Sequence, residues 1–165
     1  MQLLAWLEQT GISIQIREYV WALPILVSLH MIGLTGSVGT LVWFDLRLLG
    51  VGIPNCPVSR LYRMLKPWML GSFAVMIASG GLMFMAYATL AWADTFFWIK
   101  MAGLAVAGGN ALAYHLVTKR GIAGWDDDKL PPWPAQIAGL ISIIAWAVVI
   151  ISGRMMAYTM YGIDS

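Results

Sequence analysis

The sequence is poor in charged residues. Of its 165 residues, 10 are Lys or Arg and 8 are Asp or Glu, while 60% are hydrophobic and the mean hydropathy is +0.76. Soluble domains are about half apolar and about a quarter charged, so this chain has too few polar groups to cover the surface of one. A net charge of +2 also provides no basic stripe for nucleic acid. The composition therefore predicts a protein of the lipid bilayer and excludes a nucleic-acid partner.

Several groups that support catalysis are also missing. Cys56 is the only cysteine, which excludes an internal disulfide and any cysteine-based metal cluster. The sequence shows no nucleophile–base pair, carboxylate pair, phosphate-binding loop or Cys/His zinc spacing. These absences favour a protein that is not a catalyst.

Four long stretches contain no charge at all. They cover residues 19–44, 67–93, 101–118 and 130–153, which are 26, 27, 18 and 24 residues long. A helix needs roughly 20 residues to cross a bilayer, so we expect spans near 19–48, 66–92, 96–118 and 135–160. Short connections make sequential helices antiparallel. The sequence therefore predicts an all-α, integral membrane four-helix up-down bundle that forms a single transmembrane domain over residues 1–165.

The segments outside these spans are polar or broken by proline and glycine. Gly52, Pro54 and Pro57 interrupt residues 51–65, and an acidic run at 126–128 is expected to be a solvated loop feature. The first 18 residues contain three charges and no continuous apolar core, so they do not read as a cleavable signal. We expect them to form a short segment at the membrane interface.

Positive charges are distributed unevenly between the two sides of the predicted bundle. Seven of the ten flank the first and third connections: Arg47, Arg60, Arg63, Lys66, Lys119, Arg120 and Lys129. The other three are Arg17, Lys100 and Arg154. Because loops rich in Lys and Arg stay on the cytoplasmic side, we expect both termini to face away from the cytoplasm.

Two histidines, His30 and His115, lie within the predicted spans. Polar side chains at membrane depth are costly and usually functional, and imidazoles inside a small helical bundle are typical haem ligands. The alternative is a structural histidine that hydrogen-bonds a neighbouring carbonyl or hydroxyl group. Both interpretations remain open from the residues alone.

The two histidines are expected to lie at different depths. His30 precedes Arg47 by 17 residues, about 25 Å along a helix, whereas His115 precedes Lys119 by four, about 6 Å. The two imidazoles should therefore differ in height by about 20 Å. Either a single haem uses one histidine, or two sites lie at different depths.

Other side chains are candidates for ligands or charge partners. Met83, Met85 and Met155 fall near the expected height of His30 and offer thioether sulfurs as second ligands, although membrane methionines often only fill space. Arg154 and Arg47 are candidate partners for a haem propionate or a quinone-like headgroup, and Arg154 can instead extend to the interface.

Asn110 is expected to face a different direction from His115. Five residues separate them, about 140° around an α-helix, so they should not share a pocket. Asn110 shares a helix face with Gly103 and Ala107. This pattern predicts close helix packing with an interhelical hydrogen bond.

Sequence features over nearly the whole chain resemble an uncharacterised family of four-span bacterial inner-membrane proteins. They are Trp6-Leu7-Glu8, Ile16-Arg17-Glu18, Pro24, Leu29-His30 with Gly33, Asp45-Leu46-Arg47-Leu48-Leu49-Gly50, Pro67-Trp68, Asn110-Ala111 before His115, and Gly153-Arg154 with Ala157-Tyr158. A histidine in the first span and one near the end of the third are distantly similar to the copper-resistance D domain, the haem-associated protoporphyrinogen oxidase and cytochrome b561-like bundles. The resemblance implies a bacterial inner-membrane location with periplasmic termini, and it favours His30 as a haem ligand.

We therefore expect a b-type haem-binding protein that transfers electrons within the bilayer, rather than a catalyst. His30 is the first axial ligand and His115 a second or separate one, and quinone or a membrane redox protein is the expected partner. Two alternatives stay open. One is copper or other soft-metal handling through His30 and the methionines. The other is a non-catalytic accessory subunit that forms homo-oligomers through its small-residue faces.

Overall fold

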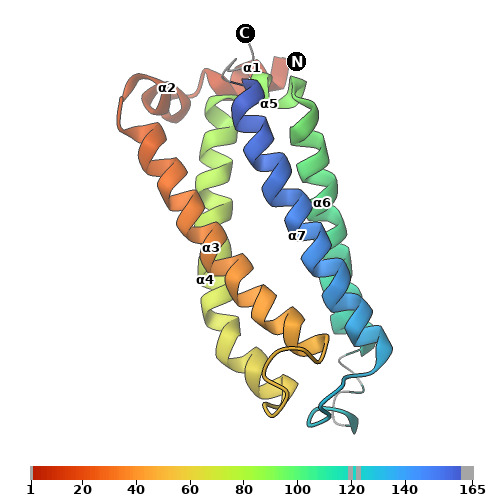
Figure 1. Cartoon of the computed structure of the whole chain (residues 1–165). Helices are drawn as coiled ribbons and strands as arrows, with labels where there is room; N and C mark the ends of the chain where they lie inside the picture. The colour runs from red at the N-terminus through yellow and green to blue at the C-terminus, as the bar shows by residue number, and fades with distance from the viewer. Residues whose placement is uncertain (1, 119–120, 122–123, 161–165) are drawn as a thin grey trace.

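The computed structural model describes residues 2–118, 121 and 124–160, and these residues form helices joined by short loops, without strands. Four helices are long and apolar enough to cross a membrane. They are α3 (Ala22–Leu48), α4 (Val58–Ala86), α6 (Thr95–Ala113), which continues as the π-helical turn η1 (Tyr114–Thr118), and α7 (Trp133–Met160). Sequential helices run in opposite directions, and both chain ends lie at the same end of the bundle (Figure 1). The expected all-α up-down bundle is confirmed.

The bundle consists of two helical pairs. α3 packs along α4, α6 packs along α7, and the pairs meet where α3 contacts α7. Glycines allow these backbones to approach closely, as is common between membrane helices. A Cβ atom on Gly33 would lie 2.8 Å from the backbone nitrogen of Met76, and one on Gly139 would lie 2.9 Å from the carbonyl oxygen of Asp45.

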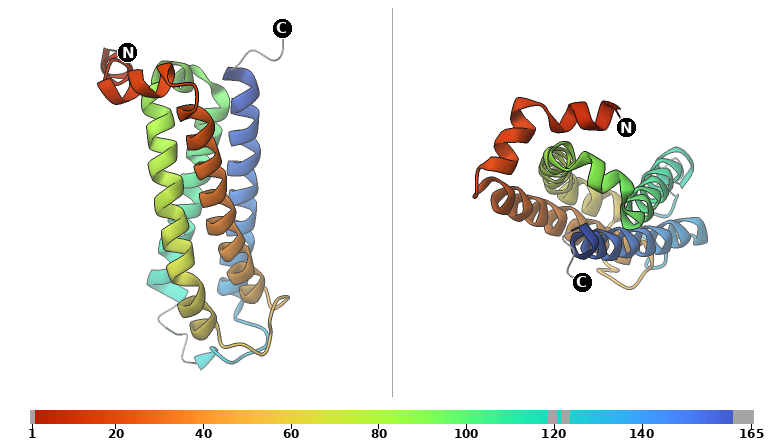
Figure 2. Two further views of the ribbon diagram at one scale, coloured as in Figure 1. Left: turned by 90° about the vertical axis from the view of Figure 1, so that its left-hand side faces the viewer. Right: turned by 90° about the horizontal axis from the view of Figure 1, so that it is seen from above.

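Three short helices lie at the end of the bundle that carries the termini: α1 (Gln2–Glu8), α2 (Gly11–Glu18) and α5 (Ala88–Ala93). α1 and α2 lie across this end instead of along the bundle (Figure 2). The Glu8 carboxylate accepts hydrogen bonds from the Thr89 backbone nitrogen at 2.7 Å and hydroxyl at 2.6 Å. Arg17 Nη1 donates to the Ala86 carbonyl oxygen at 2.9 Å. The N-terminal segment therefore docks on the junction of α4 and α5, as expected for an interfacial element.

The second spanning helix begins and ends earlier than the expected 66–92. α4 starts directly after Pro57 and continues through Pro67, because a membrane helix tolerates an internal proline. It ends before Tyr87, whose φ of −132° and ψ of 38° break the helix. The start is capped by Asp126, which accepts hydrogen bonds from the Ser59 backbone nitrogen at 2.7 Å and hydroxyl at 2.6 Å. Part of the acidic run therefore has a structural role, which corrects the expectation of a purely solvated loop.

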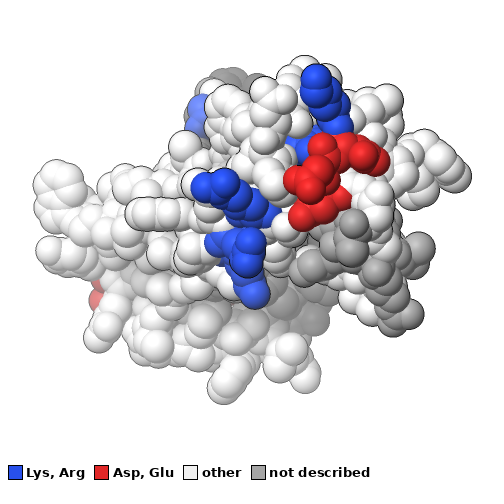
Figure 3. All heavy atoms as spheres, turned by 90° about the horizontal axis from the view of Figure 1, so that it is seen from below, with Lys and Arg blue, Asp and Glu red and all other residues white. Residues whose placement is uncertain are grey.

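The end of the bundle opposite the termini is rich in charge. Arg60, Arg63 and Lys66 lie in the first turns of α4, and Lys129 lies in the connection to α7. Figure 3 looks onto this end and shows basic and acidic side chains side by side. Lys119 and Arg120, which also entered the orientation argument, lie outside the described residues.

Candidate functional site

His30 lies on α3 and contacts α4. Its Nδ1 atom is 3.0 Å from the carbonyl oxygen of Met76 and 3.2 Å from the Ser79 hydroxyl, which itself donates to the Val75 carbonyl oxygen at 2.7 Å. A carbonyl oxygen only accepts, so Nδ1 carries the proton in this bond. In the neutral imidazole the lone pair then lies on Nε2, which is the state in which histidine binds a metal.

Small and basic residues surround His30 at this depth. A Cβ atom on Gly80 would lie 2.9 Å from Cε1 of His30, so only glycine leaves room for the ring on α4. Lys100 extends inward from α6: its Nζ would lie 3.9 Å from a Cβ atom on Gly153 of α7, and its charge is close enough to act on His30. These contacts run from α3 through α4 and from α6 to α7, and we call the residues that make them the His30 cluster (His30, Ser79, Gly80, Lys100 and Gly153).

His115 lies at the other end of the bundle. It belongs to the π-helical turn η1, and its ring centroid is 5.7 Å from those of both Tyr62 and Tyr114. π-Helical turns are rare and occur frequently at functional sites. The two histidines contact α4 at Met76 and Tyr62, 14 residues apart in the sequence, which is about 21 Å along a helix. This agrees with the separation estimated from the sequence, and no single metal ion can be bound by both.

A cavity of about 260 Å³ lies beside His115 between the four spanning helices. Its polar lining consists of six side chains: Asp45, Tyr62, Asn110, Tyr114, His115 and Ser142. Asn110 and His115 were expected to face different directions, and this expectation was wrong. Both side chains line this cavity, since the π-helical turn Tyr114–Thr118 winds differently from the regular α-helix that the estimate of about 140° assumed. The expected interhelical hydrogen bond is confirmed, since Asn110 donates to the Ala138 carbonyl oxygen of α7 at 2.8 Å.

Asp45 is the acidic group of this cavity. Its side chain is 3% exposed and lies close to the Ser142 side chain of α7, which lines the same cavity. Its Oδ2 atom is buried without a hydrogen-bond partner among the described residues. An unpaired buried polar atom costs about 1–3 kcal/mol, so this oxygen is the least satisfied polar group in the cavity.

Arg47 is fully buried and serves mainly to hold the loops. Nε donates to the Cys56 carbonyl oxygen at 2.7 Å and Nη2 to the Asp128 carbonyl oxygen at 2.9 Å, which joins both connections at this end. Nη1 has no hydrogen-bond partner among the described residues. Arg47 lies in the last turn of α3 and His30 in its first half. Arg47 can therefore neutralise the charge only of a group that is bound near the loops.

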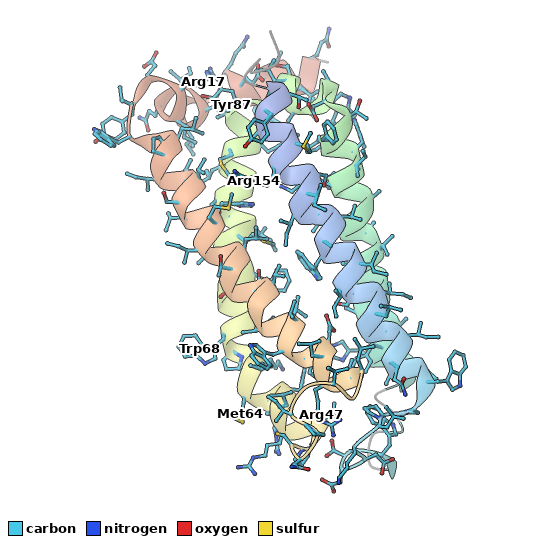
Figure 4. The ribbon with its side chains drawn as sticks, in the orientation of Figure 1. Arg17, Arg47, Met64, Trp68, Tyr87 and Arg154 are labelled. Atoms are coloured by element: carbon cyan, nitrogen blue, oxygen red, sulfur yellow. The ribbon has the colours of Figure 1, made fainter. Side chains whose placement is uncertain are left out.

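The other residues that the sequence proposed as ligands or charge partners lie toward the end of the bundle that carries the termini. Arg154 and Met155 are exposed on α7, and Figure 4 places Arg154 nearer the end with the termini than Arg47 is. Met83 and Met85 are half-buried on α4. Met83 follows Ser79 and Gly80 by four and three residues, so it shares their helix face one turn further on. Met85 does not.

The structure brings together fewer of the predicted metal ligands than the sequence proposed. Within the described part of the chain, no group of three or more His, Cys, Asp or Glu side chains is placed to hold a metal ion. Sequence reasoning also missed Lys100, which it used only as an orientation charge, and the cavity residues Tyr62, Tyr114 and Ser142. The signal for Lys100 was its position as a single charge between two apolar stretches.

Comparison with known proteins gives one match. A family described as of unknown function, DUF6644, matches residues 11–159. No curated protein and no solved structure matches the chain, so the distant similarity to copper-resistance D and cytochrome b561-like domains gains no support there. The match covers most of the chain, including α2 and all four spanning helices, and the chain therefore belongs to the family of unknown function DUF6644.

Proposed function

We propose that the protein is a b-type haem-binding integral membrane protein that carries electrons within the bilayer and exchanges them with quinone or a redox partner protein. His30 would hold the haem iron through Nε2. The observation that carries the proposal is the hydrogen bond from Nδ1 to the Met76 carbonyl oxygen. Metal-ligating histidines usually donate their other ring nitrogen to a carbonyl or carboxylate, which fixes the ring and directs the lone pair at the metal.

The His30 cluster has further features that suit a charged macrocycle. Gly80 lets the imidazole lie directly against α4, and Lys100 places a positive charge inside the bundle. A cation buried near the cofactor can neutralise a propionate, a role for which Lys100 is better placed than Arg47. Bound haem would supply a one-electron carrier, while the protein residues hold and orient it.

The location of the protein is part of this proposal. Five of the seven charges used for orientation are described, and all five lie at the loop end of the bundle, opposite the termini. The positive-inside rule then places the loop end in the cytoplasm of a bacterium and both termini in the periplasm. A second copy of the chain or a membrane redox protein would act as partner.

The test is an absorption spectrum of the protein purified from haem-replete cells, compared with His30→Asn. The Asn side chain can keep a donor near the position of Nδ1, and thus the hydrogen bond to Met76, but provides no iron ligand. We expect the wild type to show a Soret band and His30→Asn to lose most of it at unchanged thermal stability. Ser28→Ala, which removes a local hydrogen bond to Pro24 on the same helix, is the control. A full Soret band in His30→Asn excludes His30 as the ligand.

Soft-metal binding is the second candidate function, and the position of Met83 favours it. Met83 lies one turn from the contact of His30 on α4, and an imidazole with a thioether is a donor set that suits copper(I). Metal analysis that finds copper at about one equivalent, in protein without a Soret band, would favour this function over haem.

A further inference from the structure

The cavity beside His115 is separate from the His30 cluster. On α4 its lining runs from Tyr62 to Phe73, which is about 6 to 22 Å from the start of that helix at Val58. The cavity therefore lies in the half of the bundle near the loops.

Aromatic and aliphatic side chains form most of the cavity wall. Phe44, Phe73 and Trp146 line it together with Tyr114, and the Phe73 and Trp146 rings contact each other with centroids 5.4 Å apart. A volume of about 260 Å³ lies just below the roughly 300–1,000 Å³ of pockets that enclose whole drug-sized ligands. A cavity of about 150 Å³ already accepts benzene. The space therefore suits one substituted aromatic ring and is too small for a tetrapyrrole.

Asp45 determines which kind of ring fits. Asp45 lines the cavity with its side chain 3% exposed, and its Oδ2 atom is buried beneath this lining without a hydrogen-bond partner among the described residues. A purely apolar ring would leave this oxygen unpaired, at a cost of about 1–3 kcal/mol. A ring hydroxyl would donate the missing hydrogen bond, so the cavity favours a hydroxylated ring over an apolar one.

The cavity is accessible from the side of the bundle between α4 and α6. These helices contact through the stacked Phe84 and Phe97 rings near α5, but over the described residues they do not pack closely along their length. Gly108 and Ala111 of α6 line the cavity and are exposed. A Cβ atom on Gly108 would have no described neighbour within 4 Å. A ligand dissolved in the membrane can therefore enter without crossing the loops.

The geometry points to this cavity as the binding site for the hydroxylated aromatic headgroup of a quinol-type lipid, with the Asp45 carboxylate turning toward the cavity to accept a hydrogen bond from a ring hydroxyl. The inference names the redox partner of the proposed function and rests on that function for its biological meaning. Binding itself requires no haem, so the two claims can fail separately.

The experiment measures equilibrium binding of decylubiquinol to the full-length protein in lipid nanodiscs, with empty nanodiscs as the baseline. We expect saturable binding to the wild type. Gly108→Phe, which fills the lateral opening, should weaken binding at least about tenfold, whereas Gly109→Phe should leave it unchanged. Gly109 is the matched control because it also has no described neighbour within 4 Å of its Cβ position but does not line the cavity.

Two further comparisons test the hydrogen bond to Asp45. Decylubiquinol with both hydroxyls methylated should bind at least about tenfold more weakly to the wild type, because it cannot donate to the Asp45 carboxylate. In Asp45→Leu this difference between the two ligands should disappear, as expected when one side of an interacting pair is removed. If Asp45→Leu does not fold, the methylated ligand and the glycine pair still decide the question.

Distinct results would overturn the inference. Binding no greater than to empty nanodiscs, or equal loss in Gly108→Phe and Gly109→Phe, would exclude the cavity as the site. If hydroquinone binds as tightly as decylubiquinol, the cavity recognises a soluble phenol and the inference of a lipid ligand is wrong. His30→Asn should retain decylubiquinol binding, and Gly108→Phe should retain the Soret band, so failure of one claim leaves the other measurable.

Discussion

His30 connects two spanning helices through one ring nitrogen, and the same bond prepares the other nitrogen for a ligand. Nδ1 donates to the Met76 carbonyl oxygen. This carbonyl oxygen also faces the backbone nitrogen one turn further along α4. A histidine that only joined helices would serve equally well in several ring positions. The ring lies against Gly80, so its orientation is restricted on that side.

The fit between His30 and Gly80 can be tested with adjacent glycines. A Cβ atom on Gly80 would lie 2.9 Å from the imidazole, whereas one on Gly81 meets no described atom within 4 Å. Gly80→Ala should lower the free energy of unfolding by about 1–3 kcal/mol, the usual cost of overpacking. Gly81→Ala should be neutral or stabilising by up to about 1 kcal/mol, because alanine favours the helix.

Thermal or denaturant unfolding in detergent measures both glycine variants, and nuclear magnetic resonance of the imidazole reports displacement of the ring. Equal stability of the two variants, with an undisturbed His30 signal, would show that the ring does not rest against Gly80.

At the scale of elements, the N-terminal helices are attached by a few polar contacts. Glu8 on α1 accepts two hydrogen bonds from Thr89, and Arg17 Nη2 donates to the Glu8 carbonyl oxygen at 2.6 Å. The Thr89 side chain, followed by the Thr89 backbone and the Arg17 charge, lowers the pKa of Glu8 from its ordinary value of 4.5 against the opposing effect of burial. Docking of α1 and α2 therefore depends on the ionised carboxylate.

A depressed pKa sets the direction of the pH effect. The contribution of Glu8 is fully present above pH 4.5, its ordinary pKa, and is lost as the pH falls through the lower pKa of the docked state. The protection factors of the amides in residues 2–18, which correct for the pH dependence of intrinsic exchange, should fall about two- to fivefold on acidification, because hydrogen bonds of a partly exposed carboxylate contribute about 0.5–1 kcal/mol.

In Glu8→Gln, the amides of residues 2–18 should already be less protected from hydrogen exchange at neutral pH than in the wild type. Glu18→Gln, at the end of α2, is the matched control and should exchange like the wild type. Docking that is insensitive to both pH and Glu8→Gln would assign the attachment to apolar contacts instead.

The elements also show where sequence reasoning succeeds and where it fails. Charge-free stretches predicted four spans because the bilayer imposes length and composition on each helix separately. The extent of α4 was missed because its N-terminal cap, Asp126, comes from a segment 67 residues away. The shared direction of Asn110 and His115 was missed because nothing in the local sequence distinguishes a π-helical turn from an α-helical one.

The site was less predictable than the fold for a related reason. Depth along a helix follows from counting residues, so the separation of His30 and His115 was estimated correctly. The direction of a side chain depends on which helices pack together, and that is decided by contacts such as Gly33 with Met76 and Gly139 with Asp45. Only this packing of the helices brings Lys100 into the His30 cluster and Ser142 into the wall of the cavity beside His115.

At the scale of the whole molecule, the orientation in the membrane is a direct test of the charge distribution. In a Cys56→Ser background, Gln2→Cys and Asp127→Cys place single thiols at opposite ends of the bundle, and both positions are exposed. We expect a membrane-impermeant maleimide to label Gln2→Cys in intact spheroplasts and Asp127→Cys only after lysis. The reverse pattern would invert the topology and contradict the orientation derived from the positive charges.

The proposed function requires that the bundle binds haem. The decisive measurement is one absorption spectrum of the wild-type protein, purified from haem-replete cells and recorded oxidised and then reduced. We expect a Soret band that shifts on reduction, together with the narrow visible bands of a low-spin b-type haem. A colourless preparation without haem iron, obtained from the same cells, would contradict it.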